Sequence, residues 1–311
     1  MAPDPGQTAE FAELRPLLFS IAYRILGSVS EAEDAVQETW LRYAATTTRP
    51  RDLKAFLSTT ITRIAIDVLR SARVRREQYV GSWVPEPLLV DPYEDPAHAA
   101  ELADSVSMAA LLLLERLSPL ERAAFVLREV FGFSYAEVAA AVDRSQAACR
   151  QLVSRARSHM QEGRPRFEVD RAKRTELAQL FFTALKEGDV DALREMLAAD
   201  VNVVADGGGK VRARGGALGA DKTARALIAG VTPLIEMGCA IETREINGQP
   251  GAILRAPDGG ILAAWSLDIL DGRIQTLHSV NNPDKLGHLG TVGDANEIFH
   301  ERSRWRRFGS T

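Results

Sequence analysis

Apolar positions recur at three- and four-residue spacing through the first 80 residues and predict three helices. The first pattern begins at Phe11 and stops at Gly27. The second follows a capping box that we predict from Ser30 and Glu33. The third covers about residues 53–73, and its last turns are strongly basic. The N-terminal part of the chain is therefore expected to be all-helical.

A proline-rich stretch then interrupts the helical periodicity. Residues 81–96 hold four prolines, a density that excludes a regular helix and predicts an extended linker. Helical spacing resumes near residue 99. Ser118 and Glu121 form a second predicted capping box around Pro119, and Ser134 with Glu137 forms a third.

After residue 165 the pattern changes from helices to short strands. Two helices are expected at residues 176–186 and about 191–198. Asn-Gly and Asp-Gly pairs at residues 247, 258 and 271 predict tight hairpin turns. We expect a curved, meandering sheet packed on helices, an α+β domain, with a loose basic tail after residue 293. The strands are expected at residues 201–205, 210–213, 240–246, 252–256, 260–270 and 273–280.

The distribution of charge is more informative than the net charge of −4. Residues 42–76 hold nine Lys/Arg against two Asp, and residues 144–161 hold four Arg and no acid. Residues 77–115 between them hold eight Asp/Glu and no Lys or Arg. Two basic modules joined by an acidic connector favour paired contacts to nucleic acid. The overall acidity argues against tight binding to bulk DNA without a partner.

Composition predicts a globular cytoplasmic protein of several domains. Apolar residues make up 46% and charged residues 26% of 311 positions. The N-terminus lacks a signal-peptide pattern, and the longest apolar run, residues 108–114, is too short to span a bilayer, so no membrane partner is expected. Cys149 and Cys239 are not at metal-ligand spacing and are expected to be small buried apolar residues. We therefore expect neither a metal nor a cofactor.

The most specific local pattern is a helix-turn-helix at residues 135–152. Ala139 is small where the two helices must touch, and Asp143 occupies a turn position that often requires positive φ. Ser145 caps the second helix, which leaves Arg150 and Gln151 exposed with their neighbours. Arg and Gln pair with guanine and adenine edges in a major groove. The alternative is an amphipathic helical pair whose arginines are only solvated.

Two N-terminal segments resemble region two of the sigma-70 family. They are SEAEDAVQETWLRYA, residues 30–44, and LSTTITRIAIDVLRSARVRRE, residues 57–77. The resemblance implies contacts with core RNA polymerase and with both promoter elements, and a loop at residues 44–51 that holds a flipped base. Without this resemblance, the basic residues of the helix at 57–77 would be interpreted as a solvated surface. The implied polymerase contacts are Asp34, Gln37, Glu38 and Leu41; the −10 contacts are Thr59, Thr60, Arg63, Asp67 and Arg70; the −35 contacts are Ser145, Gln146, Ala147, Arg150, Gln151 and Arg155.

Three further motifs resemble the extracytoplasmic-function (ECF) subgroup that carries a SnoaL-like C-terminal domain. They are SWVPEP at residues 82–87, DGGGK at 206–210 and NPDKL at 282–286. Val84 stands where the subgroup often has Leu. The regulatory residues implied are Trp83, Pro85, Glu86, Pro87, Asp206, Gly207, Gly208, Gly209, Lys210, Asn282, Pro283, Asp284, Lys285 and Leu286.

The resemblance implies a multidomain architecture: two all-α sigma domains followed by an α+β SnoaL-like, cone-shaped barrel. The expected division is region 2 at residues 1–80, an acidic proline-rich linker at 81–104, region 4 at 105–165, the SnoaL-like domain at 166–290 and a flexible basic tail at 291–311. The C-terminal domain is expected to contact the sigma domains and to modulate their activity. The alternative is a helix-turn-helix regulator whose SnoaL-like domain senses a ligand.

Catalysis by the C-terminal domain is not expected. SnoaL-like domains share the ketosteroid isomerase fold, whose chemistry needs a carboxylate base and an acidic hydrogen-bond donor in an apolar pocket. Asp268 and His278 are candidates on adjacent strands, but the alternation around Asp268 fits an outward-facing residue equally well. Residues 207–209 lack the spacing of a phosphate-binding loop and predict a hairpin turn. Lys210 is then a surface cation available to the acidic linker or to region 4.

Overall fold

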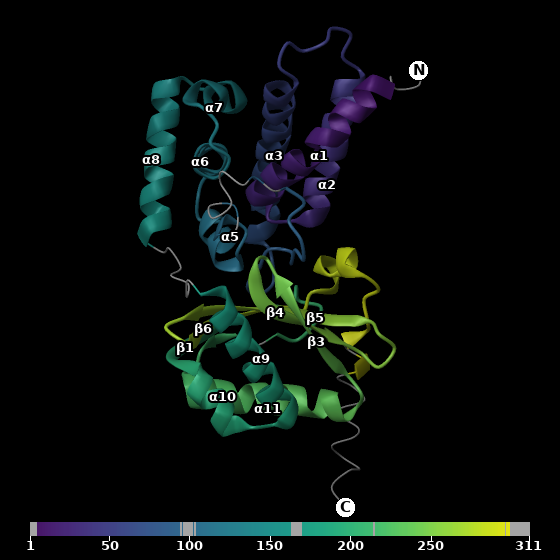
Figure 1. Ribbon diagram of the computed structural model, residues 1–311, viewed down its shortest axis with the longest axis vertical. Helices are drawn as coiled ribbons and strands as arrows, with labels where there is room; N and C mark the ends of the chain where they lie inside the picture. Colours follow the sequence, from purple (N-terminus) through teal and green to yellow (C-terminus); the bar gives the residue numbers. More distant parts are fainter. Residues whose placement is uncertain are drawn as a thin grey trace, which may run out of the picture. The chain divides into compact units, whose positions relative to one another are not determined.

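The chain passes between two structural units three times. A computed structural model describes residues 5–93, 95, 102, 104–162, 170–213, 215–295 and 297–298 (Figure 1). Unit 1 comprises Met1–Gln78 and Val90–Arg164, and unit 2 comprises Tyr79–Leu89 and Pro165–Thr311. The segment Tyr79–Leu89, which contains SWVPEP and is called the linker from here on, therefore belongs to unit 2, although it connects the two helical halves of unit 1. Among the described helices, none combines the length and apolar character needed to cross a membrane.

The first half of unit 1 is a bundle of α1 (Pro5–Leu26), α2 (Val29–Ala44) and α3 (Leu53–Glu77). As predicted, α1 ends before Gly27, which takes a positive φ of 70°. The predicted capping box at Ser30 is wrong. The N-cap of α2 is Ser28, whose Oγ accepts a hydrogen bond from the Glu31 backbone amide at 3.1 Å. The helix begins earlier because Ser28 already has the extended backbone that a cap requires.

The second half of unit 1 contains the predicted helix-turn-helix. Its elements are α5 (Met108–Leu114), α6 (Pro119–Phe125), a π-helical segment (Val126–Val130), α7 (Tyr135–Val142) and α8 (Gln146–Glu162). The capping boxes of Ser118 with Glu121 and of Ser134 with Glu137 are both confirmed. Asp143 ends α7 in the left-handed conformation, with φ 53°, as predicted for the turn.

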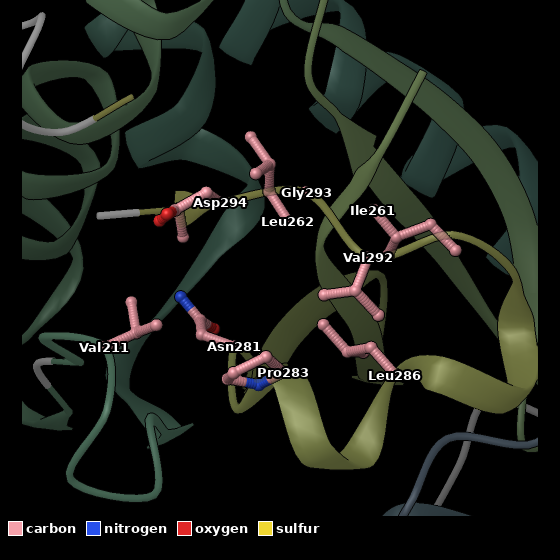
Figure 2. Close-up of a pocket in the computed structure, with 10 residues that line it drawn as sticks. Val211, Ile261, Leu262, Asn281, Pro283, Leu286, Val292, Gly293 and Asp294 are labelled. Atoms are coloured by element: carbon pink, nitrogen blue, oxygen red, sulfur yellow. The ribbon is translucent and has the colours of Figure 1, made fainter. Parts of the chain in front are cut away.

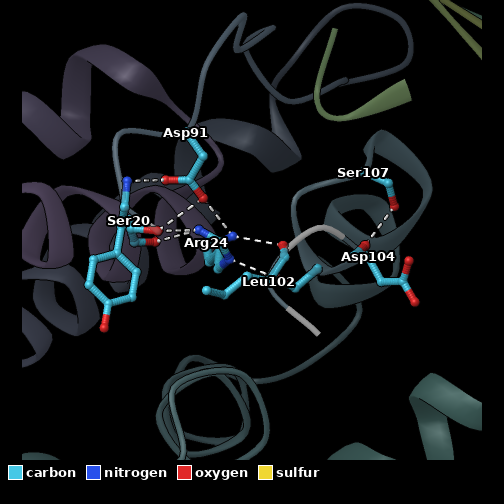
Figure 3. Close-up of polar contacts among 8 residues, drawn as sticks. Ser20, Arg24, Asp91, Leu102, Asp104 and Ser107 are labelled. Atoms are coloured by element: carbon cyan, nitrogen blue, oxygen red, sulfur yellow. Dashed lines mark hydrogen bonds and ion pairs between the residues drawn. The ribbon is translucent and has the colours of Figure 1, made fainter. Parts of the chain in front are cut away.

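Buried arginine Arg24 joins the two halves of unit 1 (Figure 3). Its Nη2 donates to Asp91 Oδ2 at 2.7 Å and to the Leu102 carbonyl at 2.9 Å, while its Nε donates to Ser105 Oγ at 2.7 Å. The Arg24 carbonyl in turn accepts from Arg122 Nε of α6 at 2.9 Å. Because a buried guanidinium is stable only when its donors are satisfied, this network fixes the segment after the linker onto α1.

Unit 2 is a curved six-stranded sheet with three helices on one face (Figure 1). The helices are α9 (Arg171–Glu187), α10 (Val190–Met196) and α11 (Ala220–Glu236). The strand order is β2-β1-β6-β5-β4-β3, in which β1 and β6 are parallel and the other neighbours antiparallel. The sheet is open, so the expected barrel is an incompletely closed one. The strands are β1 (Leu197–Asp206), β2 (Gly216–Ala217), β3 (Ala240–Ile246), β4 (Gln249–Arg255), β5 (Ile261–Leu270) and β6 (Arg273–Val280).

The core of unit 2 lies between the helices and the sheet. Phe182 of α9 stacks on Trp265 of β5 with ring centroids 6.3 Å apart. The strand predicted at residues 210–213 is wrong, because the amides of Lys210 and Val211 both donate to the Gly207 carbonyl and form a turn. The short strand β2 follows it instead. Helix α11 was not predicted.

The start of the predicted tail is attached to the sheet. Ile261 donates its amide to the Thr291 carbonyl at 2.8 Å, and Gly293 donates to the Ile261 carbonyl at 3.0 Å. Residues 299–311 of that tail, with its cluster of basic side chains, lie outside the described residues.

Candidate functional site

One face of α2 carries all four predicted polymerase contacts. Asp34, Gln37, Glu38 and Leu41 follow the i, i+3, i+4, i+7 spacing of a single helical face, and the opposite face packs into the bundle. Glu38 pairs with Arg42 at 2.8 Å on the surface. Leu41 is 55% exposed. This face therefore presents acidic groups together with an exposed apolar side chain and is accessible to a protein partner.

The predicted −10 contacts form a stripe along α3. Thr59 and Thr60 are partly buried, whereas Arg63, Asp67 and Arg70 are exposed on later turns. Thr60 Oγ1 donates to the Phe56 carbonyl at 2.8 Å, and Arg70 pairs with Asp67 at 3.2 Å.

Helix α7 packs against the N-terminal part of this stripe, at Thr59 and Arg63. Arg63 Nη2 donates to the Ala140 carbonyl at 2.7 Å and its Nε donates to the Ala141 carbonyl at 3.3 Å. These carbonyls belong to the last turn of α7, where helix geometry leaves acceptors unpaired and the dipole favours a cation. Thr59 lines a small apolar cavity of about 260 Å³ between α3 and α7, to which Leu127 and Phe133 also contribute. In this arrangement α7 occupies part of the face predicted to bind the −10 element.

The predicted −35 contacts all lie on the exposed side of α8 or at its N-cap. Ser145 Oγ accepts the Ala148 amide at 3.2 Å and so caps the helix. Arg150 lies 5.1 Å from the Tyr135 ring centroid, and Arg155 Nε donates to Glu121 Oε1 at 2.8 Å. Burial raises the pKa of Glu121, but hydrogen bonds from Ser118 and Arg155 outweigh it and lower the pKa overall. Gln146, Ala147 and Gln151 are exposed beside them.

The three C-terminal motifs meet around one buried carboxylate. Asp206, at the end of β1, is fully buried and accepts four hydrogen bonds. The donors are the Tyr79 hydroxyl at 2.6 Å, the Val84 amide at 2.9 Å, Lys285 Nζ at 2.7 Å and the Gly208 amide at 3.0 Å. Two of these donors come from the linker, so the first residue of DGGGK binds the SWVPEP segment directly.

Lys285 supplies the positive charge of this cluster. Its Nζ lies 4.2 Å from the Trp83 ring centroid and 5.0 Å from that of Tyr79, and it also donates to the Val84 carbonyl. Asn282 Nδ2 donates to the Tyr79 hydroxyl at 2.8 Å. Burial and the hydrogen bond to Asp206 raise the pKa of Tyr79. The predicted motif residues Trp83, Asp206, Asn282 and Lys285 thus form one contact network.

A second anchor holds the far end of the linker, and sequence reasoning missed it. The Asn247 amide donates to the Leu88 carbonyl at 2.7 Å, and Asn247 Oδ1 accepts the Leu88 amide at 2.9 Å. His288 Nε2 lies 2.6 Å from the Pro87 carbonyl, and its Nδ1 lies 4.0 Å from the buried Glu86. Asn247 was predicted only as a hairpin turn residue. Hereafter the linker seat means Asp206, Asn247, Asn282, Lys285 and His288.

The glycines of DGGGK allow the close approach of this loop to its neighbours. A Cβ on Gly207 would lie 1.9 Å from the Val211 carbonyl oxygen, and one on Gly208 would lie 2.3 Å from Asn282 Nδ2. Gly208 and Gly209 also have positive φ. Lys210 ends the motif on the surface, where its Nζ pairs with Asp284 of NPDKL at 2.7 Å. That pair links the two motifs rather than the motif and the acidic linker.

The two candidate catalytic residues form a buried pair. His278 Nε2 lies 2.7 Å from Asp268 Oδ2, and both side chains are buried. The outward-facing interpretation of Asp268 is therefore wrong, because β5 is a central strand buried from Ile261 to Ile269. Cys149 and Cys239 are buried as expected, and burial raises the pKa of both thiols. Among the described residues, no cluster of three His, Cys, Asp or Glu side chains is placed to hold a metal ion.

The helical unit and its helix-turn-helix define a sigma-70-type protein. Residues 11–75 match the family described as Sigma-70 region 2, and residues 107–160 match Sigma-70, region 4. The chain is 38% identical over 291 residues to the ECF RNA polymerase sigma factor SigJ of Mycobacterium tuberculosis, covering 90% of this chain and 93% of that protein. It is 32% identical to the probable ECF sigma factor SigI of the same species, covering 92% and 96%.

The crystal structure of M. tuberculosis SigJ has the same fold over most of the chain. It matches with a TM-score of 0.70 and 33% identity, covering 90% of this chain and 98% of that one. The chain belongs to the ECF RNA polymerase sigma factors and carries a SnoaL-like C-terminal domain. Membership of this family sets aside the alternative of a conventional helix-turn-helix regulator.

Proposed function

We propose that this sigma factor directs core RNA polymerase to specific promoters and that its C-terminal domain restrains it by holding the linker. The polymerase-binding face is the exposed face of α2 that contains Asp34, Gln37, Glu38 and Leu41. Helix α3 opens the −10 element with Thr59, Thr60, Arg63, Asp67 and Arg70. The exposed side of α8 reads the −35 element. The C-terminal domain modulates these activities without catalysis.

The observation that carries the proposal is the double engagement of Arg63. A side chain needed at the −10 element donates instead to the Ala140 and Ala141 carbonyls of α7. Promoter binding through this face of α3 requires the contact to break, because α7 packs on α3 where Arg63 lies. In this proposal the α3–α7 contact is the restrained form of unit 1, and polymerase binds a form in which α3 and α7 separate.

The linker seat supplies the means by which the C-terminal domain favours that restrained form. Tyr79 and Leu88 are both anchored on unit 2, while Asp91, three residues further along, is held by Arg24 in unit 1. We expect a linker fixed at these points to limit how far the two helical halves of unit 1 can move apart. Because the domain is tethered, even modest contacts act at high effective concentration. Releasing the linker is therefore expected to shift the population toward the open form.

The proposed restraint is tested by comparing two truncated chains, one without and one with the linker seat. A chain ending at residue 166 lacks the linker seat, whereas a chain ending at residue 298 keeps it and serves as the matched control. We expect the shorter chain to give higher transcript output with core polymerase at equal protein concentration, and the control to match the full chain. Equal output from all three would exclude a regulatory role for the C-terminal domain.

The initiation role has a separate test. Purified chain alone should not bind promoter DNA specifically, and addition of core polymerase should produce a melted promoter, detected by a fluorescent base in the −10 element. Specific promoter binding by the chain alone, with no effect of core enzyme, would contradict the assigned division of contacts.

A further inference from the structure

A cavity of about 290 Å³ lies in unit 2 beside the linker seat (Figure 2). It is bounded by the start of β5, the NPDKL segment and the chain at residues 292–295. Its volume is about twice that of the ~150 Å³ protein cavity that holds benzene. A substituted ring therefore fits it, whereas a larger cofactor does not. The walls combine the polar side chains of Asn281 and Asp294 with apolar ones from Val211, Ile261, Leu262, Pro283, Leu286 and Val292.

Asn281 presents a hydrogen-bond donor at this cavity. The indole Nε1 of buried Trp265, which is a donor only, bonds Ser279 Oγ at 2.9 Å. Ser279 must then donate its own hydrogen, and its acceptor is Asn281 Oδ1. This relay fixes the amide with its oxygen toward Ser279 and leaves the Nδ2 hydrogens for another acceptor. No described residue accepts a hydrogen bond from that nitrogen, and Asn281 lines the cavity.

Charge narrows the chemistry of a ligand further. Asp294 lines the same cavity and uses Oδ1 to accept the Glu297 amide at 3.0 Å, which holds the carboxylate at this edge. Its negative charge disfavours an anion, because like charges repel each other at this short range. The cavity is therefore suited to a neutral molecule with an acceptor oxygen for Asn281 Nδ2.

The cavity and the linker seat share one structural element. Pro283–Lys285 forms a single 3-10 turn that is followed by Leu286. Asn282 and Lys285 bind the linker, while Pro283 and Leu286 line the cavity. The backbone N–H of Asn281 also donates to the Asp206 carbonyl at 2.7 Å, next to the buried Asp206 carboxylate of the linker seat. A molecule that fills the cavity thus supports the turn that holds the linker.

We propose that this cavity binds a small, neutral, ring-containing molecule with a carbonyl-type oxygen, and that binding strengthens the linker seat. The coupling requires that the Pro283–Lys285 turn holds its position only while the linker is seated, so that a ligand packed against this turn binds the seated state more tightly. The effect of the ligand on the linker rests on the proposed role of the linker seat, whereas binding in the cavity does not. Binding and its effect on the linker are therefore measured separately.

Binding is tested with acetophenone, a neutral ring with one carbonyl oxygen, against benzoate, an anion of the same shape. Heteronuclear NMR titration of the full chain should show saturable shifts around residues 281–295 with acetophenone and at least tenfold weaker binding of benzoate. Val292→Trp, which fills the cavity, should abolish the shifts, whereas Thr291→Trp on the exposed neighbouring position should keep them. Asn281→Asp retains an acceptor for Ser279 but lacks the amide donor, so it should weaken acetophenone binding at least tenfold.

The melting temperature of each variant checks that the domain is folded. Absence of saturable shifts with acetophenone, or shifts that persist in a folded Val292→Trp variant, would overturn the site. Equal binding of benzoate and acetophenone would overturn the proposed ligand class.

Coupling is tested by hydrogen exchange at the two linker amides that bond the seat. At tenfold excess over its dissociation constant, acetophenone should slow exchange at Val84 by up to about tenfold, because ligand-bound protein must lose ligand before the linker leaves. Leu88, held by the more distant Asn247, should slow less. Binding with no change at Val84 would overturn the coupling but leave both the site and the promoter-directed function standing.

Discussion

Replacing Lys285 by Met should release the linker from the C-terminal domain. Lys285 and Asp206 form a buried ion pair, with side chains 8% and 0% exposed. Met retains much of the length of Lys without its charge, so it leaves the Asp206 carboxylate buried without its cation. Removing one partner of such a pair costs about 3–5 kcal/mol. We expect this loss to weaken the seated linker, because Lys285 also contacts Trp83, Tyr79 and the Val84 carbonyl and because Asp206 binds Tyr79 and Val84.

Lys210→Met is the matched control. Lys210 makes an ion pair of the same length, 2.7 Å, with Asp284, but those side chains are 54% and 60% exposed. An exposed pair contributes about 0–1 kcal/mol. The same substitution in a neighbouring motif should therefore leave the linker seated.

Amide hydrogen exchange measures the release directly. The Val84 amide donates to Asp206, so it exchanges only when the linker leaves the seat or the unit unfolds. A loss of 3 kcal/mol corresponds to exchange faster by a factor of roughly 100 or more. The Leu267 amide in central strand β5 reports unfolding of the sheet and should stay much slower to exchange than the Val84 amide. Equal acceleration of Val84 in the two variants, or a Val84 amide that exchanges as slowly as Leu267 in Lys285→Met, would refute the reasoning.

The other predictions concern unit 1. Reversing the charges of Asp34 and Glu38 together should prevent co-elution with core polymerase at moderate salt with little change in melting temperature, because both lie on the surface of α2; retained co-elution would exclude this face. Arg150→Ala should reduce discrimination at one −35 base position by about 1–3 kcal/mol in competition transcription, whereas a uniform loss on all promoters would indicate a phosphate contact. The fold lowers the pKa of Glu121, so its stabilising effect should be complete above about pH 4.5 and lost as pH falls further. In urea unfolding, the free energies of unfolding of Glu121→Gln and of the unchanged chain should therefore converge in acid. A difference that stays constant with pH would contradict the assignment.

The helix ends of unit 1 could be predicted well because capping and turn residues act on their close neighbours in the sequence. Ser118, Ser134 and Asp143 act through residues at most four positions away, and the structure confirms each of them. Helix α11 lacked such signals: its N-cap, Gly219, makes no side-chain cap, and Pro233 lies inside the helix. The turn at Lys210 was misread as a strand because its two amides bond Gly207, a choice made by the packing of the loop.

The linker seat lay beyond sequence reasoning in its geometry, although its motifs were recognised. Asp206 bonds residues 122 and 127 positions earlier, and Lys285 bonds a carbonyl 201 positions earlier. No periodicity reports contacts at such separation. The sequence pointed even less to Asn247 and His288. Asn247 was interpreted only as a turn residue, and His288 belongs to none of the recognised motifs.

The most direct measurement of the central claim is transcription by core polymerase with the full chain, Lys285→Met and Lys210→Met at equal concentration on one promoter. If the C-terminal domain restrains the factor by holding the linker, Lys285→Met should raise transcript output above that of the full chain, and Lys210→Met should match the full chain. Linker release in Lys285→Met, seen by exchange at Val84, together with unchanged output would contradict the claim.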